Sequence, residues 1–302
     1  MPGTGAVNIW SHRNKMPSDM KISVVIPAYN EEEVIGEVVK RVFAVDRSFE
    51  VIVVDDGSSD RTAEEAEKAG ARVVRNPYNV GNGATIKNGA RASTGDVVVF
   101  MDGDGQHPPE QIPSLLEHIG PYDMVVGART ARSDTSRFRN VGNWGLIQVA
   151  QWITGKKIDD LTSGFRAIKR EWLEEFIHLF PNGYSYPTTI TIALMQSGRF
   201  VKYIPMDSIK RRETGQSNIR PFKDALKFIY IIARVIILFS PQRFFLPLSG
   251  LALAAGLTVS ALQLFFLGGI MSTGVILIMS SVYIGCFGLL VEQISMLRRE
   301  RR

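Results

Sequence analysis

A stretch of 48 consecutive residues near the C-terminus, Phe244 to Val291, contains no Asp, Glu, Lys, Arg or His. As a single helix it would be about 72 Å long, whereas the hydrocarbon core of a bilayer is about 30 Å thick. The chain must therefore turn back within this stretch. The sequence "GGIMSTG", Gly268 to Gly274, provides the turn, and about 22 and 17 apolar residues flank it, close to the roughly 20 that a membrane span needs. We predict a transmembrane hairpin with a basic tail over residues 246–302.

The charges around this hairpin predict its orientation. Arg243 precedes it and "LRRERR" follows it, whereas the turn between the two spans carries no charge. Because positive charge is retained in the cytoplasm, both chain ends and the remainder of the chain are expected there, on an integral membrane protein. The alternative is a pair of buried core helices in a soluble protein. Gly250, Gly256 and Gly285 favour the membrane, since small residues allow helices to pack closely in lipid.

Two further segments lie outside the predicted central domain, which covers residues 21–220. Residues 221–245 are apolar but interrupted by lysine and arginine, a pattern typical of amphipathic helices that lie in the headgroup layer. Residues 1–20 lack the apolar run of a signal peptide and are expected to form a flexible extension. The single cysteine, Cys286, allows no disulfide within the chain.

The central domain reads as alternating strands and helices, which indicates an α/β fold with a mostly parallel sheet. In such sheets ligands bind beyond the carboxyl ends of the strands. The predicted strands are 21–27, 50–56, 71–76, 96–102, 123–129 and 200–205, and the predicted helices are Glu31–Ala44, Arg61–Ala69, Ala84–Ala92 and Pro109–Ile119.

The carboxyl ends of these strands are strongly polar. The apolar run "VVVFM" leads directly into "DGDGQ", so Asp102, Asp104 and Gln106 follow at every second position. Helix capping accounts for carboxylates such as Asp60 elsewhere, but two carboxylates at one sheet edge repel each other unless a cation or a hydrogen-bonding ligand compensates them. Oxygen ligands of this kind suit Mg²⁺ or Mn²⁺ with open positions for phosphate oxygens. The neighbouring His107 is either a further ligand or, as we favour, a loop residue near the site.

These motifs resemble the family 2 glycosyltransferases of GT-A fold, a Rossmann-like architecture, and within them the dolichol-phosphate mannose synthases and polyprenyl-phosphate glycosyltransferases. The resemblance runs from about Lys21 to the C-terminus and rests on "VIPAYNE", "VIVVDDGSSD", "DGDGQHPPE", "DDLTSGFRAIKR" and "RRETGQSN". It implies a cation bound by Asp104 and Gln106, with Asp102 at the nucleotide or sugar. The other residues that it implies for the nucleotide sugar are Pro27, Tyr29, Glu31, Val54, Asp56, Gly103, Arg212, Ser217 and Asn218.

The resemblance further implies an acceptor site. Arginine presents a planar charged fork that suits phosphate, so Arg129 and Arg139 are expected at the lipid phosphate, with Arg132 and Arg137 as rivals to Arg139. Asp160 either orients the acceptor, acts as a base, or pairs with Arg166. Asn218 stands where relatives carry lysine, which removes one cation from the expected diphosphate site.

The implied activity is metal-dependent, inverting transfer of a hexose from a GDP- or UDP-sugar to dolichyl or undecaprenyl phosphate at the cytoplasmic membrane face. One alternative is a transferase that extends a glycan or glycolipid hydroxyl, which would need a general base. Another is a membrane-tethered nucleotide-sugar binding protein without activity. No nucleic-acid partner is expected, and association into a homo-oligomer is left open.

Overall fold

The computed structural model describes residues 20–129, 137–183, 186–206, 230, 233–234, 236–269 and 272–300. The chain divides into two compact units. The first comprises Met1–Arg139 and Ile158–Ser217, and the second comprises Asn140–Lys157 and Asn218–Arg302. The short segment 140–157, which the sequence places inside the central domain, thus groups with the C-terminal helices.

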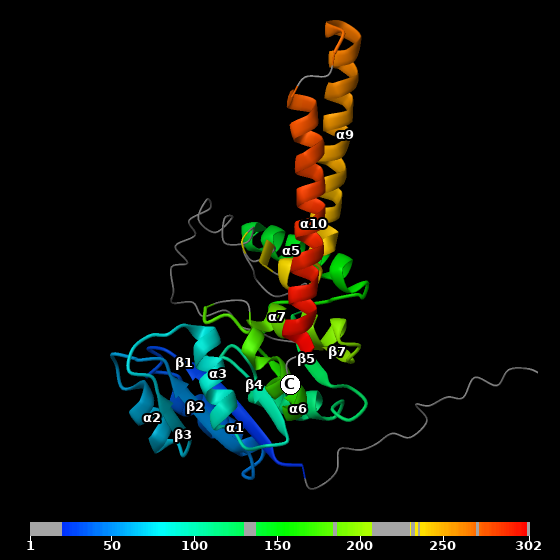
Figure 1. The fold of residues 1–302 in the computed structure, drawn as a ribbon. Coiled ribbons are helices and arrows are strands. Elements are labelled where there is room, and N and C mark those ends of the chain that lie inside the picture. The colour runs from blue at the N-terminus through cyan, green and yellow to red at the C-terminus, as the bar shows by residue number, and fades with distance from the viewer. Residues whose placement is uncertain are drawn as a thin grey trace, which may run out of the picture. The chain divides into compact units, whose positions relative to one another are not determined.

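The first unit is built on a seven-stranded sheet of order β3-β2-β1-β4-β6-β5-β7 (Figure 1). The strand β1 (Ile22–Ala28) lies between β2 (Glu50–Asp55) and β4 (Val97–Phe100) and runs parallel to both. The chain builds outward from β1 through β2 to β3 (Arg72–Arg75) and then returns to the other side of β1 with β4. A reversal of this kind is the point at which open α/β sheets bind ligands.

The other half of the sheet contains its only antiparallel member among the described strands. The strand β6 (Arg166–Lys169) lies between β4 and β5 (Met124–Arg129) and is antiparallel to both. The strand β7 (Val201–Met206) closes this side of the sheet and is parallel to β5. The prediction of a mostly parallel α/β sheet is therefore confirmed.

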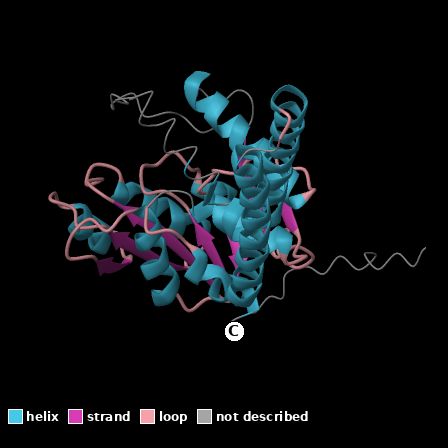
Figure 2. Cartoon of the chain, turned by 45° about the horizontal axis from the view of Figure 1, so that its top comes forward, coloured by secondary structure: helices cyan, strands magenta, loops and turns pink. Residues whose placement is uncertain are grey.

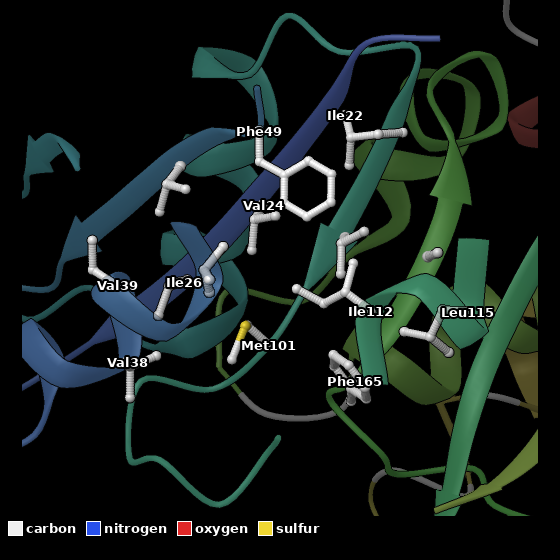
Figure 3. Close-up of a cluster of buried hydrophobic side chains, with 14 of the residues drawn as sticks. Ile22, Val24, Ile26, Val38, Val39, Phe49, Met101, Ile112, Leu115 and Phe165 are labelled. Carbon is white, nitrogen blue, oxygen red and sulfur yellow. The ribbon is translucent and has the colours of Figure 1, made fainter. Parts of the chain in front are cut away.

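Helices cover both faces of this sheet (Figure 2). On one face, alternate residues of β1 such as Ile26 pack with Val38 and Ile112 in a cluster of buried side chains (Figure 3). On the other face, Gly89 approaches Val25 so closely that a Cβ atom would lie 2.3 Å from its Cγ1 atom. The helices of this unit are α1 (Ile35–Val45), α2 (Thr62–Lys68), α3 (Asn82–Ala92), α4 (Ile112–Leu116, after a 3-10 turn at Pro109–Gln111), α6 (Arg170–Phe176, before a 3-10 turn at Ile177–Leu179) and α7 (Tyr186–Gln196).

All six predicted strands and four predicted helices are present, although individual ends differ by up to four residues. Sequence reasoning missed β6, α6, α7 and the 18-residue helix α5 (Arg137–Thr154), most of which belongs to the second unit.

The second unit contains two long apolar helices, α9 (Pro241–Leu267) and α10 (Ser272–Glu300). By length and composition both could cross a membrane, over Pro241–Phe266 and Ser272–Leu297. Only 6% and 17% of their most apolar windows are buried, which contradicts the alternative of two core helices in a soluble protein. Of the predicted interfacial segment 221–245, residues 241–245 form the start of α9 and most of the remainder lies outside the described residues.

The two long helices pack through small residues. The Oγ atom of Ser249 donates a hydrogen bond to the carbonyl oxygen of Ser281 at 2.8 Å. A Cβ atom on Gly256 would lie 2.9 Å from the backbone nitrogen of Ile278, so the helices approach too closely there for any larger residue. Gly268, with φ of 69°, ends α9 in the left-handed conformation that glycine favours.

The substitution Gly256→Ala is expected to push the two helices apart, because the added Cβ meets backbone. Overpacking of this kind costs about 1–3 kcal/mol, so the melting temperature of the protein in detergent should fall. Gly250→Ala in the same helix is the matched control, since a Cβ there meets nothing within 4 Å. Equal melting temperatures for the two variants would contradict this packing.

Candidate functional site

A cleft of about 480 Å³ opens at the carboxyl ends of β1, β2 and β4, where the strand order reverses. Seven of the residues predicted to bind a nucleotide sugar or metal line it, together with residues from the start of α3 and one glycine from the loop before α7. Its lining consists of Pro27, Ala28, Tyr29, Glu31, Asp56, Asn79, Gly81, Asn82, Thr85, Asp102, Gly103, Asp104 and Gly183.

Glycine allows the loop after β4 to approach its neighbours closely. A Cβ atom on Gly103 would lie 2.9 Å from the carbonyl oxygen of Pro27 at the end of β1. A Cβ atom on Gly164 would lie 2.8 Å from the Oδ2 atom of Asp102. A side chain at position 103 would meet backbone and displace this loop, whereas one at position 164 would meet the carboxylate of Asp102.

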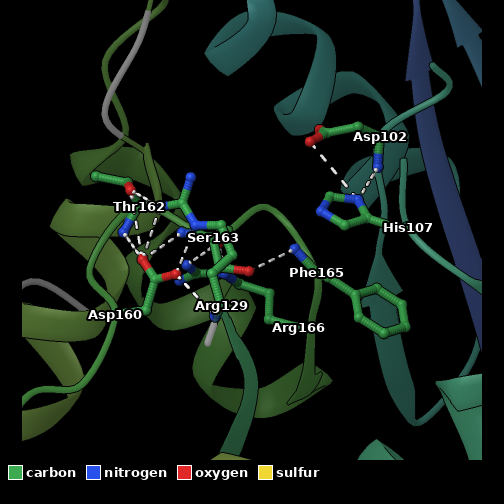
Figure 4. Close-up of polar contacts among 8 residues, drawn as sticks. All are labelled: Asp102, His107, Arg129, Asp160, Thr162, Ser163, Phe165 and Arg166. Carbon is green, nitrogen blue, oxygen red and sulfur yellow. Dashed lines mark hydrogen bonds and ion pairs between the residues drawn. The ribbon is translucent and has the colours of Figure 1, made fainter. Parts of the chain in front are cut away.

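His107 supports the same loop through a hydrogen bond to its backbone. Its Nδ1 atom accepts a hydrogen bond from the backbone N–H of Asp102 at 3.1 Å, so the proton of the neutral ring is on Nε2 (Figure 4). The ring is buried and stacks on Phe165 with 5.3 Å between ring centroids. The distance of 3.6 Å between Nδ1 and the Oδ2 atom of Asp102 therefore joins two acceptors and provides no positive charge. This arrangement agrees with a loop residue rather than a metal ligand.

Asp102 and Asp104 are the carboxylates of this loop that line the cleft. The Oδ1 atom of Asp104 accepts the backbone N–H of Gln106 at 3.0 Å, and Gln106 itself does not line the cleft. Among the described residues, no group of three His, Cys, Asp or Glu side chains could hold a metal ion. The residues present fit Mg²⁺ or Mn²⁺ that keeps waters and takes substrate phosphates as its other ligands.

Asp56 lines the cleft, but its two carboxylate oxygens also hold the adjacent loop. They accept hydrogen bonds from the Nδ2 atom of Asn76 at 2.8 Å and from the backbone N–H groups of Val80 and Gly81 at 3.0 and 3.1 Å. Val54 is fully buried in β2 and its side chain faces α3. Asp56 thus fixes the wall formed by residues 79–81, a support that the sequence did not indicate.

The backbone N–H groups at the start of α3 donate hydrogen bonds to another loop of the chain. The backbone N–H groups of Gly83 and Ala84 donate to the carbonyl oxygens of Gly183 and Asn182 at 3.0 and 2.9 Å. Because these donors are used, the glycine-rich sequence "NVGNGATIKNG" is a helix start beside the cleft and not a phosphate cradle. Asn82 and Thr85 of this helix line the cleft.

At the end of β5, Arg129 pairs with Asp160. Its Nε and Nη2 atoms donate to the two carboxylate oxygens of Asp160 at 2.8 and 3.0 Å, and Nη2 also donates to Thr162 (Figure 4). The predicted alternative, in which Asp160 pairs with Arg166, is wrong, because both carboxylate oxygens of Asp160 accept hydrogen bonds from the guanidinium of Arg129. Arg129 Nη1 makes no hydrogen bond within the described part of the chain.

Burial and ion pairing shift the pKa values of Asp160 and Arg129 in opposite directions. Burial opposes the charge of Asp160, but the hydrogen bonds and charge of Arg129 outweigh it and hold the pKa of Asp160 below its ordinary value. Burial likewise opposes the charge of Arg129, and the hydrogen bonds to Asp160 raise its pKa nonetheless. A carboxylate with a lowered pKa is a weak base.

Arg166 is fully buried with neutral partners. It donates to the carbonyl oxygens of Ser163 and Pro187 and to the hydroxyl of Thr191, and its guanidinium lies 5.8 Å from the ring centroid of Tyr186. Burial lowers the pKa of Arg166. The side chain therefore ties the loop that carries Gly164 to the first turns of α7.

The structure does not describe the side chains of four predicted site residues. Arg212, Ser217 and Asn218 lie outside the described residues. Arg139 lies in the first turn of α5, where the structure describes the backbone but not the side chain.

Two segments of the chain match models of known protein families. Residues 23–177 match the model of "Glycosyl transferase family 2", and residues 240–297 match that of the "GtrB C-terminal hairpin". The first match covers the cleft lining except Gly183, together with the Arg129–Asp160 pair, and the second covers α9 and most of α10.

Several similar curated proteins are polyprenyl-phosphate sugar transferases by name. An undecaprenyl-phosphate 4-deoxy-4-formamido-L-arabinose transferase of Enterobacter sp. is 31% identical over 82% of this chain and 77% of its own length. The dolichol-phosphate mannosyltransferase of Pyrococcus furiosus is 32% identical over 67% of this chain and 60% of its own length. A Pectobacterium carotovorum homologue of the arabinose transferase is 38% identical over 54% of this chain. The chain spans only 53% and 60% of the length of the Pectobacterium and Pyrococcus proteins.

Solved structures share the fold of the first unit. Glucosyl-3-phosphoglycerate synthase of Mycobacterium tuberculosis aligns with a TM-score of 0.56 at 24% identity, over 72% of this chain and 80% of that one. The same enzyme crystallised with Mn²⁺ and UDP-glucose aligns with a TM-score of 0.57 at 22% identity, over 72% of this chain and 78% of that one. At this identity the likeness shows the fold, and it confirms the predicted GT-A architecture.

The substitution Asp160→Asn is expected to destabilise the first unit at neutral pH by up to about 3 kcal/mol, because it removes the charge that compensates Arg129, whose side chain is 27% exposed. Since folding lowers the pKa of Asp160, its stabilising charge is fully present above the unfolded-state pKa of about 3.9 and is lost as the pH falls through the lower folded value. The wild type should therefore lose stability on acidification below about pH 4 more steeply than the variant.

Denaturant unfolding in detergent, followed by circular dichroism across this pH range, measures both effects. Glu117→Gln, at an exposed carboxylate at the end of α4, is the control and should leave the free energy of unfolding within about 0.5 kcal/mol of wild type. A variant at Asp160 with wild-type stability at neutral pH would contradict the importance of the pair.

Proposed function

Because this chain belongs to glycosyl transferase family 2, we propose that it transfers a hexose from a nucleoside diphosphate sugar to polyprenyl phosphate. One observation carries the proposal: a cleft lined by Asp102 and Asp104 occurs in a chain that also has two helices able to cross a bilayer. A soluble acceptor would not require such helices. The names of similar proteins, which pair undecaprenyl or dolichol phosphate with sugar transfer, support the same acceptor class.

The donor is a GDP- or UDP-hexose bound in the cleft. Pro27, Tyr29 and Glu31 at the end of β1 contact the nucleoside, and Asp102 and Gly103 contact the ribose or sugar. Asp104, which lines the cleft, would hold Mg²⁺ or Mn²⁺, whereas Gln106 does not line the cleft. When bound, the ion would neutralise the diphosphate as its bond to the sugar breaks. The similar fold of an enzyme crystallised with Mn²⁺ and UDP-glucose supports this ligand class.

The acceptor is held by arginine. Arg129, fixed by Asp160, contributes N–H donors at the end of β5, and Arg139 contributes a second guanidinium. A phosphate monoester has a second pKa of about 6 and is therefore already anionic at neutral pH, so its oxygen needs alignment rather than a base. The paired state and lowered pKa of Asp160 favour this acceptor over a hydroxyl, which would need deprotonation.

In the proposed step, a phosphate oxygen of the lipid attacks the anomeric carbon from the face opposite the diphosphate. A new carbon–oxygen bond forms, the bond to the nucleoside diphosphate breaks with its electron pair, and the configuration inverts. No proton transfer is required, because the attacking oxygen and the leaving group are both anions.

The site faces the cytoplasm in this proposal. Arg243 lies at the start of α9, and Arg298 and Arg299 lie at the end of α10, so this positive charge lies at one end of the hairpin. Because positive charge is retained in the cytoplasm, this distribution supports a cytoplasmic transferase unit.

The first test is turnover by the full chain in detergent with UDP- and GDP-hexoses, Mg²⁺ or Mn²⁺, and undecaprenyl or dolichyl phosphate. Asp104→Asn is expected to weaken metal-dependent nucleotide binding at least about tenfold, the lower limit for loss of even an outer-shell partner of a metal. Asp46→Asn, at an exposed carboxylate before β2, is the matched control and should bind normally.

Two results decide this test. Nucleotide binding that is independent of metal and of Asp104 would contradict the proposed site. Normal binding without turnover on any lipid phosphate would instead favour the non-catalytic alternative.

A second test distinguishes binding of the acceptor from binding of the donor. Arg139→Gln is expected to raise the KM for polyprenyl phosphate about 10-fold or more, because a hydrogen bond to a charged group contributes about 1.5–3 kcal/mol. Nucleotide affinity, measured by calorimetry on the same preparation, should not change. Arg91→Gln at an exposed position of α3 is the control. Equal weakening of both ligands would contradict the division of roles.

A further inference from the structure

Asn30, in the loop after β1, has a φ of 54° and is the only residue other than glycine with a positive φ in the described part of the chain. This left-handed conformation costs free energy for residues with a Cβ atom, although asparagine tolerates it better than most. Its two neighbours, Tyr29 and Glu31, line the cleft, whereas Asn30 itself does not. A strained residue between two cleft residues marks a place where the surrounding structure dictates the backbone.

The side chain of Asn30 contacts the loop after β2. Its Oδ1 atom accepts hydrogen bonds from the backbone N–H and the hydroxyl of Ser59 at 2.9 and 3.3 Å. The backbone N–H of Asn30 in turn donates to the Oγ atom of Ser58 at 2.9 Å. Asn30 thus joins the two loops through both its backbone and its side chain, and these contacts hold it in the left-handed conformation.

The next two residues continue the contact between the loops. The backbone N–H of Glu31 donates to the Oγ1 atom of Thr62 at 2.8 Å. The backbone N–H of Glu32 donates to the Oδ2 atom of Asp60 at 3.2 Å. Because these successive N–H groups already donate to side chains, the segment does not offer them to a phosphate. Its contribution to the cleft is to hold the neighbouring side chains in place.

The loop after β2 is itself fixed by the structure around it. The backbone N–H of Ser58 donates to the Oδ1 atom of Asp55, the last residue of β2, at 3.0 Å. A Cβ atom on Gly57, which has a φ of 73°, would lie 2.6 Å from the backbone carbonyl carbon of Tyr78. The contacts of Asn30 therefore join the end of β1 to a loop that has little freedom to move.

We propose that Asn30 is a positioning residue for the nucleotide sugar, which holds Tyr29 and Glu31 in the conformation that binds the nucleoside. The identity of the ligand rests on the proposed function, whereas the contacts of Asn30 exist in the chain without ligand. A loop that is ordered in advance binds more tightly, because binding does not have to order it. Since Asn30 is exposed, loss of its contacts should weaken nucleotide binding more than it weakens the fold.

Three substitutions separate the two properties of Asn30. Asn30→Ala removes both the acceptor and the tolerance of a left-handed backbone, Asn30→Gly removes only the acceptor, and Asn30→Asp keeps both. Calorimetry of the full chain in detergent with Mn²⁺ and UDP or GDP measures the dissociation constant. It should rise about tenfold for Asn30→Ala, by less for Asn30→Gly, and by no more than about twofold for Asn30→Asp. The KM for polyprenyl phosphate and the melting temperature should change little.

Ser48→Ala is the matched control and should bind nucleotide as the wild type does. It removes a hydrogen bond of 2.7 Å to Asp46 in an exposed loop whose residues do not line the cleft. The expected order of affinity among the three variants supports the proposal. Wild-type affinity of Asn30→Ala overturns it, and so does equal weakening by Asn30→Asp or by the control. An equal rise in the KM for polyprenyl phosphate also overturns it, because the role would then be merely structural.

Hydrogen exchange without nucleotide distinguishes failure of this proposal from failure of the proposed function. The backbone amides of residues 30–32 should exchange faster in Asn30→Ala than in the wild type, because their acceptors are no longer held in place. Nucleotide binding by the wild type with unchanged exchange in Asn30→Ala overturns the role of Asn30 alone. A wild type that binds neither UDP nor GDP contradicts the proposed function and, with it, the ligand of this loop.

Discussion

The cleft depends on how negative charge is compensated at one edge of the sheet. Asp56 accepts three hydrogen bonds from the loop beside it, and Asp160 is filled by the fork of Arg129. The backbone N–H of Asp102 donates to the imidazole of His107, and Asp104 accepts the backbone N–H of Gln106, so contacts with backbone groups hold the loop whose two carboxylates line the cleft. The fold thus holds Asp56 and Asp160 through contacts within the chain, and in the proposed function an incoming ion binds beside Asp104.

Below this edge, buried arginines stiffen the structure at an electrostatic cost. A buried ion pair such as Arg129–Asp160 contributes little net stability, yet removal of one partner is expensive, so the pair defines geometry more than it raises stability. Arg166 has no carboxylate in contact among the described residues and relies on carbonyl and hydroxyl oxygens. Its charge therefore favours anions nearby, which suits a cleft that we propose binds a diphosphate.

Local sequence patterns allowed much of the sheet and part of the cleft to be predicted. Continuous β-branched runs identify buried strands, and the carboxyl end of a parallel strand identifies the ligand side, so Asp102 and Asp104 could be placed without a structure. The strand β6 was missed because "RAIK" is short and charged at both ends, and no sequence pattern indicates that Arg166 is buried. The partner of Asp160 was misassigned because Arg129 is distant in sequence and meets it only through the sheet.

The second unit extends the same reasoning to lipid. Leu251 and Phe265 of α9 are 70% and 81% exposed, so the hairpin requires a solvent as apolar as its own side chains.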